Sequence, residues 1–190
     1  MSDLRGLVVV ISGPSGVGKG SVHAGLPGLL DGLETSVSVT TRAPRPGERD
    51  GVAYHFVDEG TFDRMVATGA LLEWAEYAGN RYGTPRAPLE DAVLRGRTVL
   101  LEIEVQGALQ VRSRLPEALL IFLVPPAFDE LERRLRDRGT EDEAKIEARL
   151  EVARGEMSSQ DRFDHVVIND DLGRATREVA DLIARARSGL

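Results

Sequence analysis

The chain has 190 residues, of which 42% are hydrophobic and 29% are charged, and it contains no cysteine. This composition indicates a folded globular protein with one core, and it excludes a disordered chain, a disulfide framework and a thiolate metal site. The formal net charge of −7 argues against a sequence-independent nucleic-acid binder, because such proteins usually present a basic face. The apolar run over residues 7–11 is too short for a membrane span and no cleavage site follows it, so we expect a cytoplasmic protein.

The first predicted element is a buried strand over residues 7–12, which runs directly into the string GPSGVGK. The string matches the G-x-x-x-x-G-K pattern between a strand and a helix, the setting that this phosphate-binding motif requires. In such a loop backbone N–H groups and the lysine bind phosphate oxygens, whereas a chance glycine turn would not combine this spacing with a lysine. The residues assigned to the loop are Gly13, Ser15, Gly16, Val17, Gly18, Lys19, Gly20 and Ser21.

The position after the lysine departs from the general motif, which has a serine or threonine there as a magnesium ligand. Here that position is Gly20, and Ser21 follows. The order Gly-Lys-Gly-Ser resembles the loop of nucleoside monophosphate kinases such as adenylate kinases. The resemblance implies that Ser21 faces the phosphates of ATP and that Mg2+ is held mainly by nucleotide oxygens and water. Because Gly25, Pro27 and Gly28 come soon after, we expect a short first helix that ends or kinks near Gly25.

Four further stretches are short, rich in valine, leucine or isoleucine, and bounded by turn or helix signals, as buried parallel strands are. They cover residues 36–40, 98–105, 119–124 and 165–169. Apolar residues at helical spacing mark later helices, over residues 128–135, 146–157 and 172–186. This alternation predicts an α/β fold with a five-stranded parallel sheet flanked by helices.

Two segments differ from this alternating core. Residues 36–88 hold short apolar pieces with many glycines and prolines, which indicates an inserted, largely β subdomain. Residues 126–157 are densely charged and helical, which suits a lid that moves over the sheet. The remaining residues, 1–35, 89–125 and 158–190, form the predicted nucleotide-binding core.

The segment SVSVTTRAPRPGERDGVAYHF, residues 36–56, holds two arginines in a loop that its prolines stiffen. An ordinary solvated loop is the alternative, but the whole string closely resembles the GMP-binding segment of guanylate kinases. Further strings resemble that family in its order and extend the resemblance over almost the whole chain: LLEWAEYAGNRYGTP, VQGALQV, PPAFDELERRLRDRGTEDEAKIEARL and VVINDDL. The resemblance implies the P-loop fold of nucleoside monophosphate kinases, with a mixed β subdomain that binds GMP and a helical lid.

The resemblance assigns two groups of residues to GMP. Those for its phosphate are Arg42, Arg45, Tyr54 and Tyr82, and those for the guanine base and its surroundings are Ser38, Glu73, Thr84 and Glu104. Guanine presents two parallel donors, N1–H and the 2-amino group, which the Glu73 carboxylate can accept as a fork, whereas adenine has neither donor on that edge. Taken alone, Glu73 would be interpreted as an ordinary surface carboxylate.

Two acidic residues lie near the end of the third predicted strand. The family usually has aspartate at the position of Glu104, and the extra methylene group still lets a carboxylate reach the base or a water beside it. Glu102 comes two residues earlier and therefore lies on the same strand face, where a carboxylate fits near magnesium-bound water. We therefore take Ser21 and Glu102 as the candidate metal contacts, Glu102 acting indirectly.

On the donor side, the string ELERRLRDR puts Arg134 and Arg138 four residues apart and thus on one helix face. A salt-bridged surface helix is the ordinary interpretation of such a run. The resemblance singles out these two arginines, with Arg149 on the next helix, as lid residues that close onto the phosphates. It also puts Asn169 beside the adenine of ATP, where a plain strand-ending turn is the alternative. Phosphoryl transfer requires alignment, exclusion of water and positive charge. The candidate catalytic residues are Lys19, Arg42, Arg134, Arg138 and Arg149.

The sequence thus predicts a guanylate kinase that transfers the γ-phosphoryl group of ATP, bound with Mg2+, to GMP and also to dGMP. One alternative is a guanylate-kinase-like protein-interaction module, but such modules typically have eroded phosphate loops. A kinase for another nucleoside monophosphate is opposed by Ser38 and Glu73. The expected partners are these nucleotides, with neither nucleic acid nor membrane, and a homo-oligomer is left open.

Overall fold

The computed structural model describes residues 6–77, 79–137 and 143–189, and its first sheet has five strands. In the order β2-β7-β1-β8-β9, their bounds are Leu33–Thr35, Thr98–Glu102, Leu7–Ser12, Leu119–Val124 and His165–Ile168. β2 runs parallel to β7, and β8 runs parallel to both β1 and β9. β1 and β8 are buried along their whole length, as strands covered on both faces are. The predicted α/β fold with a five-stranded parallel sheet is confirmed.

A second sheet has four strands and is mixed. In the order β4-β3-β6-β5, their bounds are His55–Phe56, Val39–Thr40, Asn80–Pro85 and Leu71–Tyr77. β3 runs parallel to β4, whereas β6 runs antiparallel to both β3 and β5. This sheet lies inside the segment for which the sequence predicts an inserted, largely β subdomain.

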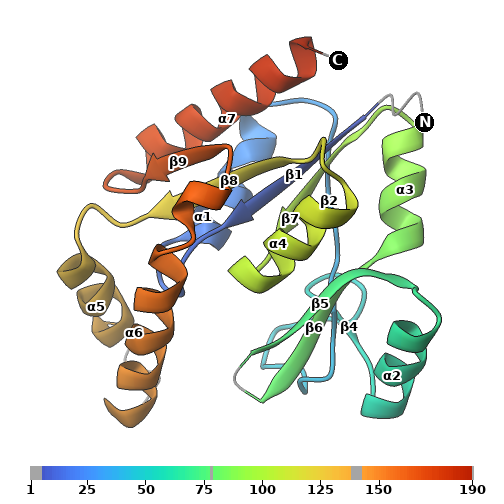
Figure 1. Ribbon diagram of the computed structural model, residues 1–190, viewed down its shortest axis with the longest axis horizontal. Helices are drawn as coiled ribbons and strands as arrows, with labels where there is room; N and C mark the ends of the chain where they lie inside the picture. The colour runs from blue at the N-terminus through green and yellow to red at the C-terminus, as the bar shows by residue number, and fades with distance from the viewer. Residues whose placement is uncertain (1–5, 78, 138–142, 190) are drawn as a thin grey trace. The chain divides into compact units, whose positions relative to one another are not determined.

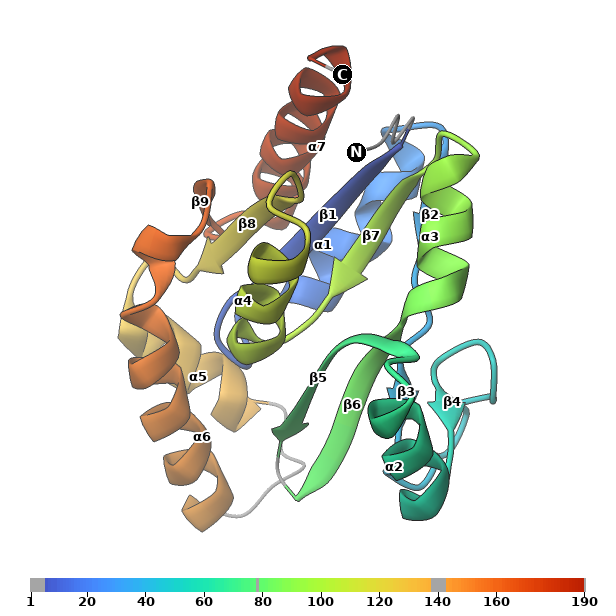
Figure 2. The ribbon, with the colours of Figure 1, turned by 45° about the vertical axis from the view of Figure 1, so that its right-hand side comes forward.

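Helix α2, Glu59–Ala67, accompanies the mixed sheet and was not predicted (Figure 2). The carboxylate of Asp58 caps its first turn by accepting from the Thr61 N–H at 2.6 Å. Its one buried side chain, Phe62, packs in a cluster with Val39 and Leu71 from the sheet. A helix that buries one large residue leaves little hydrophobic periodicity in the sequence, which explains why the pattern missed it.

Two of the predicted strands are wrong in their bounds by several residues, and a third, predicted over residues 165–169, ends one residue earlier at Ile168. The strand predicted over residues 36–40 divides between the two sheets: Leu33–Thr35 pairs with β7, and Val39–Thr40 belongs to the mixed sheet. The Ser36 N–H still donates to the Leu100 carbonyl at 3.0 Å, and the chain leaves the first sheet after this bond. The strand predicted over residues 98–105 ends at Glu102, because helix α4 already begins at Val105.

The chain divides into two compact units. Unit 1 comprises Met1–Val8, Gly32–Leu101 and Gln106–Ala118, and unit 2 comprises Val9–Asp31, Glu102–Val105 and Leu119–Leu190. Unit 1 holds the mixed sheet, β2, most of β7, and the helices α2, α3 (Arg86–Leu94) and most of α4 (Val105–Arg114). The three-part division expected from the sequence remains a prediction.

Unit 2 begins with the short first helix that the sequence predicts. Helix α1 spans Lys19–Gly25 and passes directly into a 3-10 turn, η1, over Leu26–Gly28. Pro27 lies in that turn, where its missing N–H costs no helical hydrogen bond. The expected end near Gly25 is confirmed.

The other helices of unit 2 are α5 (Phe128–Asp137), α6 (Glu143–Met157), the 3-10 turn η2 (Gln160–Arg162) and α7 (Leu172–Ser188). α7 packs against α1, β8 and β9, whereas α5 and α6 lie side by side (Figure 1). Leu135 of α5 and Ile146 and Leu150 of α6 form one buried cluster between these two helices. Within the described ranges, no helix is both long enough and apolar enough to cross a membrane.

Candidate active site

The glycine loop joins β1 to α1, and three of its glycines have backbone angles that other residues rarely adopt. The φ angles of Gly13, Gly16 and Gly18 are 141°, 89° and 101°. At Gly18 an added Cβ would lie 2.5 Å from the side-chain nitrogen of Asn169, so a side chain is also excluded for lack of space. The chain therefore curls between a buried strand and a helix N-terminus, which is the geometry that presents backbone N–H groups to phosphate.

Lys19 is 8% exposed, and its ammonium group is bound by the loop. Nζ donates to the carbonyl oxygens of Gly13 at 2.6 Å and Pro14 at 3.4 Å, and it forms an ion pair with Glu104 at 3.4 Å. Charge-assisted bonds to phosphate oxygens are stronger than bonds to neutral carbonyls. The ammonium group is therefore held where it can exchange its carbonyl partners for phosphate.

Two carboxylates accompany this lysine, and one of them was missed. Glu156 of α6 lies beside Glu104 and Lys19 and accepts from the Ser15 N–H. Burial and the neighbouring charge of Glu104 raise the pKa of Glu156 to about 7, although Lys19 acts in the opposite direction. Nothing in the run of charges around residue 156 distinguishes this glutamate, because only the fold brings it to the loop. Glu104, which was expected near the guanine base, pairs with Lys19, and its base contact remains a prediction.

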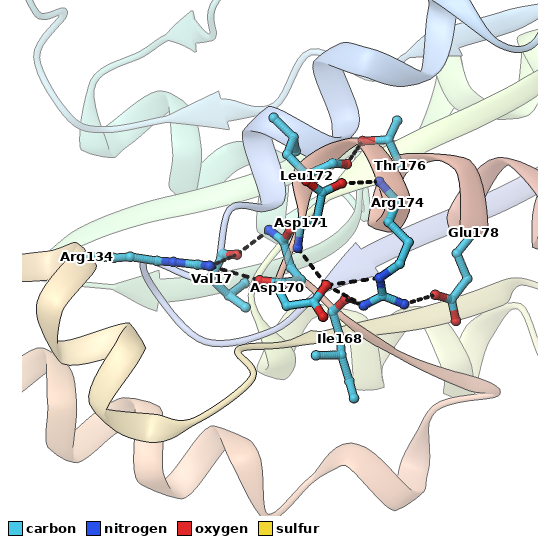
Figure 3. Close-up of polar contacts among 10 residues, drawn as sticks. Val17, Arg134, Ile168, Asp170, Asp171, Leu172, Arg174, Thr176 and Glu178 are labelled. Atoms are coloured by element: carbon cyan, nitrogen blue, oxygen red, sulfur yellow. Dashed lines mark hydrogen bonds and ion pairs between the residues drawn. The ribbon is translucent and has the colours of Figure 1, made fainter.

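The end of β9 and helix α5 both contact the glycine loop (Figure 3). Arg134 donates to the Asn169 carbonyl at 2.9 Å and to the Val17 carbonyl at 3.3 Å. Asn169 is 5% exposed, and its side-chain amide donates to the same Val17 carbonyl at 2.7 Å. The pocket at this point is lined by Gly16, Gly18, Ser21, Arg134, Asp137, Asn169, Asp170 and Leu172. Two of the predicted donor-site residues, Arg134 and Asn169, thus lie together at the loop.

Two other arginines, Arg138 and Arg149, are predicted for the lid. Arg138 lies outside the described residues, and Arg149 is half-buried on α6. Other charged residues of α5 form surface salt bridges, as the alternative interpretation of this helix predicts. Arg133, for example, binds Glu130 by two hydrogen bonds of 2.8 and 2.9 Å. The role of Arg149 toward phosphate remains a prediction.

Gly20, which replaces the usual hydroxyl, faces Glu102. An added Cβ at Gly20 would lie 3.4 Å from Glu102 Oε1, an ordinary contact distance. Ser21 is exposed and lines the pocket. No cluster of three or more histidine, cysteine, aspartate or glutamate side chains that could hold a metal occurs in the described part of the chain. Ser21 and Glu102 offer the oxygen ligands that Mg2+ prefers, and their part as metal contacts remains a prediction.

In unit 1, the predicted phosphate-binding residues are gathered around Arg42. Its guanidinium forms a two-point fork with Glu48 at 2.8 and 3.0 Å, and its Cζ lies 5.4 Å from the centre of the Tyr54 ring. The Tyr54 and Tyr82 rings are 5.9 Å apart in an edge-to-face arrangement. The backbone N–H of Arg45 donates to the same Glu48 carboxylate at 2.7 Å, while its side chain is exposed.

Glu48 was not predicted, although it stands in the string that carries the family resemblance. Its carboxylate accepts both the Arg42 fork and the Arg45 N–H, much as a phosphate oxygen pair would. The fork with Arg42 and the Arg45 N–H lower the pKa of Glu48, so it remains charged. The basic loop is therefore ordered around a carboxylate of its own, and its binding of the GMP phosphate remains a prediction.

The predicted base-reading carboxylate is buried. Glu73 on β5 is 3% exposed and lies opposite Thr84 on β6. The Thr84 hydroxyl donates to Glu73 Oε1 at 2.6 Å. Burial raises the pKa of Glu73 to about 7, while the Thr84 hydrogen bonds and the charge of Arg114 oppose this rise. Ser38 is half-buried just before β3, and its contact with a base remains a prediction.

A glycine loop with a buried lysine, set between the central strand and the first helix of a parallel sheet, defines the class of P-loop nucleotide-binding proteins. The comparisons with known proteins are more specific. The family model "Guanylate kinase" matches residues 5–186. The chain therefore belongs to the guanylate kinase family.

Individual relatives agree with this assignment. The chain is 55% identical over 177 residues to a guanylate kinase from Leifsonia xyli, covering 93% of this chain and 70% of that protein. It is 53% identical over 194 residues to one from Thermus thermophilus, covering 100% of this chain and 85% of that protein. A crystal structure of guanylate kinase from Anaplasma phagocytophilum superposes with a TM-score of 0.80 at 35% identity, covering 96% of this chain and 86% of that one.

Proposed function

We propose that this protein is an ATP:GMP phosphotransferase, which converts GMP and ATP into GDP and ADP. The observation that carries the proposal is the buried carboxylate of Glu73, 3% exposed, in the unit that also holds the Arg42 cluster. A buried carboxylate can accept hydrogen bonds from a ligand with two adjacent donors, such as the guanine edge. A base without these donors leaves the carboxylate unpaired, which makes the free energy of binding less favourable. The family assignment supports the same acceptor.

Each residue then has a defined task. The loop N–H groups and Lys19 bind the ATP phosphates, because a curled loop at a helix N-terminus and a buried ammonium group both favour anions. Arg42, Arg45, Tyr54 and Tyr82 hold the GMP phosphate, with Arg42 oriented in advance by Glu48. The lid arginines Arg134, Arg138 and Arg149 add positive charge around the transferred group.

Further details of the proposal concern the metal, the second acceptor and the location. Mg2+ would be held by nucleotide oxygens and water, with Ser21 and, through water, Glu102 as the protein contacts. When bound, it neutralises charge on the phosphates. dGMP is a second acceptor, because the residues assigned to GMP read the base and the phosphate. A cytoplasmic location, independence of nucleic acid and the absence of a membrane partner belong to the proposal.

The proposed acceptor is tested by an ADP-release assay with ATP and a panel of nucleoside monophosphates. We expect turnover with GMP and dGMP, and little turnover with AMP, CMP or UMP. Comparable activity with AMP would contradict the base-reading role of Glu73.

A lysine variant tests the donor side and separates an enzyme from a binding module. We expect Lys19→Met to retain its fold and GMP binding and to lose nearly all turnover, because it removes the charge that meets the phosphates. Full activity in this variant would contradict the role of Lys19. GMP binding without turnover in the wild type would favour the protein-interaction module instead.

A further inference from the structure

The strand that carries Glu73 lies at the edge of its own sheet. β5 is the last strand in the order β4-β3-β6-β5, so within this sheet it pairs with β6 alone. The register of that pairing shifts between Leu71 and Glu73, and Leu72 has no partner in it. On its outer side an edge strand presents backbone N–H and C=O groups that its own sheet does not bind, and a bulge adds an unpaired residue.

Two side chains of α4 bind this strand on either side of Glu73. Gln110 Nε2 donates to the Trp74 carbonyl at 2.6 Å, and the Trp74 N–H donates to Gln110 Oε1 at 3.4 Å. Arg114 donates to the Leu72 carbonyl, on the residue that the sheet leaves unpaired. Gln110 and Arg114 are four residues apart and so share one face of α4, which lies with β5 in unit 1.

The charge of Arg114 acts on Glu73 as well. It opposes the rise in pKa that burial imposes on Glu73, as do the Thr84 hydrogen bonds. Within the described ranges, Thr84 and Arg114 are the hydrogen-bonding and charged groups that act on the Glu73 carboxylate. A carboxylate that accepts two N–H donors from a base must be ionised, so a nearby positive charge favours binding near neutral pH.

We propose that Gln110 and Arg114 are positioning residues for Glu73, holding the β5 backbone on both sides so that its carboxylate keeps the direction in which it meets the acceptor base. This inference rests on the proposed function. The two residues touch neither nucleotide; they act through the strand.

The chain provides an internal probe of this arrangement. Trp74 is the only tryptophan in the sequence, it adjoins Glu73, and both of its backbone polar groups are bound by Gln110. Its ring lies 6.2 Å from that of Phe62, edge to face. Tryptophan fluorescence therefore reports on β5 in the absence of ATP and of turnover.

The experiment compares the full chain with the variants Gln110→Met, Arg114→Met and Arg114→Lys, and with Arg112→Met as control. Methionine keeps the length of glutamine without its polar atoms. Arg112 is on the same helix but donates to the Pro116 carbonyl at 2.7 Å, so its substitution removes the same charge without releasing β5. The measurements are the GMP dissociation constant by tryptophan fluorescence at several pH values, kcat, and the KM values of GMP and ATP.

For Gln110→Met we expect the GMP dissociation constant to rise roughly fivefold, the factor that one net hydrogen bond supplies, with little change in the KM of ATP. For Arg114→Met we expect weaker GMP binding and a shift of its pH midpoint to higher pH relative to the wild type. Arg114→Lys should restore the midpoint because it restores the charge. In these comparisons the titration of the GMP phosphate cancels, because it is common to all variants.

GMP binding like that of Arg112→Met in both Gln110→Met and Arg114→Met would overturn the proposal, as would an unmoved pH midpoint in Arg114→Met. If Arg114→Met does not fold, Gln110→Met decides the matter, since methionine keeps the volume of the side chain nearly unchanged. Failure of the wild type to phosphorylate GMP would instead refute the proposed function. The two failures are therefore distinguishable.

Discussion

At the scale of single residues, the glycine loop contains positions that require glycine and one that does not. Gly18 has a φ of 101°, and a Cβ there would lie 2.5 Å from the Asn169 side chain that braces Val17. Gly20 lies in α1 and has ordinary contact distance to Glu102. The same substitution at these two sites should therefore have different consequences.

We expect Gly18→Ala to lower the free energy of unfolding by about 2 kcal/mol, because a side chain in this backbone conformation is strained. It should also weaken ATP binding, since either the loop or the Asn169 side chain that lines the pocket must move to relieve the clash. Gly20→Ala should change stability by less than about 0.5 kcal/mol and retain ATP binding. Urea unfolding and calorimetric titration with ATP measure both effects, and equal losses in the two variants would contradict the assignment.

Glu73 links acceptor binding to stability. Its pKa in the folded protein is raised to about 7 from the ordinary 4.5, because burial penalises the ion. The folded state therefore keeps a proton that the unfolded chain releases between these values. This contribution to stability is fully present below pH 4.5 and is lost as the pH rises through 7.

Removal of this charge should stabilise the protein at alkaline pH while impairing its function. We expect Glu73→Gln to raise the free energy of unfolding at pH 8 by about 3 kcal/mol, with a much smaller gain at pH 5. GMP binding should weaken, because the amide keeps one acceptor only. Urea unfolding at the two pH values gives the result. Glu76→Gln, an exposed site on the same strand, is the control and should change little; a pH-independent gain for Glu73→Gln would count against the raised pKa.

At the scale of secondary-structure elements, the short first helix is explained by its packing against α7. Gly25 has an ordinary φ of −81°, so its backbone does not require glycine. A Cβ there would, however, lie 2.9 Å from the Thr176 methyl group on α7. The two helices approach closely at this point, and the glycine provides the space.

A double-mutant cycle tests this contact. We expect Gly25→Ala to destabilise the protein by about 1 kcal/mol, because overpacking outweighs the better helix propensity of alanine. Thr176→Ser removes the methyl group and keeps the hydroxyl bond to the Leu172 carbonyl at 2.6 Å. The double variant should regain the stability of Thr176→Ser or exceed it, as measured by urea unfolding.

Gly28→Ala serves as the matched control, because no atom lies within 4 Å of a Cβ at that position. Its effect should be the same with and without Thr176→Ser. If the effect of Gly25→Ala on stability is also the same with and without Thr176→Ser, close helix packing does not explain the glycine at position 25.

At the scale of the whole molecule, the parts that were predictable are those with a strong local signal. Leu119–Val124 is an unbroken apolar run and was found with correct bounds. The strand Leu33–Thr35 was not predicted, because it is a half-exposed edge strand with a charged residue at its centre. The stronger apolar pattern that follows it belongs to the other sheet. Whether such a segment forms a strand, and in which sheet, depends on pairing partners that lie far along the chain. A local sequence pattern holds no information about those partners.

The site shows the same division. Lys19 and Gly18 were identified from spacing, because a phosphate loop is a local motif. Glu156 and Gln110 were missed, because their importance comes from neighbours that lie far away in the sequence: Lys19 for Glu156, and Trp74 for Gln110. The sequence around a glutamate in a charged helix does not indicate that it has such a distant partner. Polar residues whose partners lie far away in the sequence are therefore the ones that sequence reasoning does not identify here.

Lys19 and Glu73 belong to different units. We therefore expect one variant to lose stabilisation by ATP alone and another to lose stabilisation by GMP alone. A ligand at 100 times its Kd stabilises the fold by about 2.7 kcal/mol, which for this chain length corresponds to a rise in Tm of about 5–10 °C. We expect Lys19→Met to lose the rise with ATP and keep the rise with GMP, and Glu73→Gln to show the reverse. Thermal unfolding with each nucleotide alone measures this. Loss of both responses in Lys19→Met would mean that the lysine supports the fold of the acceptor site as well, and the assignment of one nucleotide to each unit would fail.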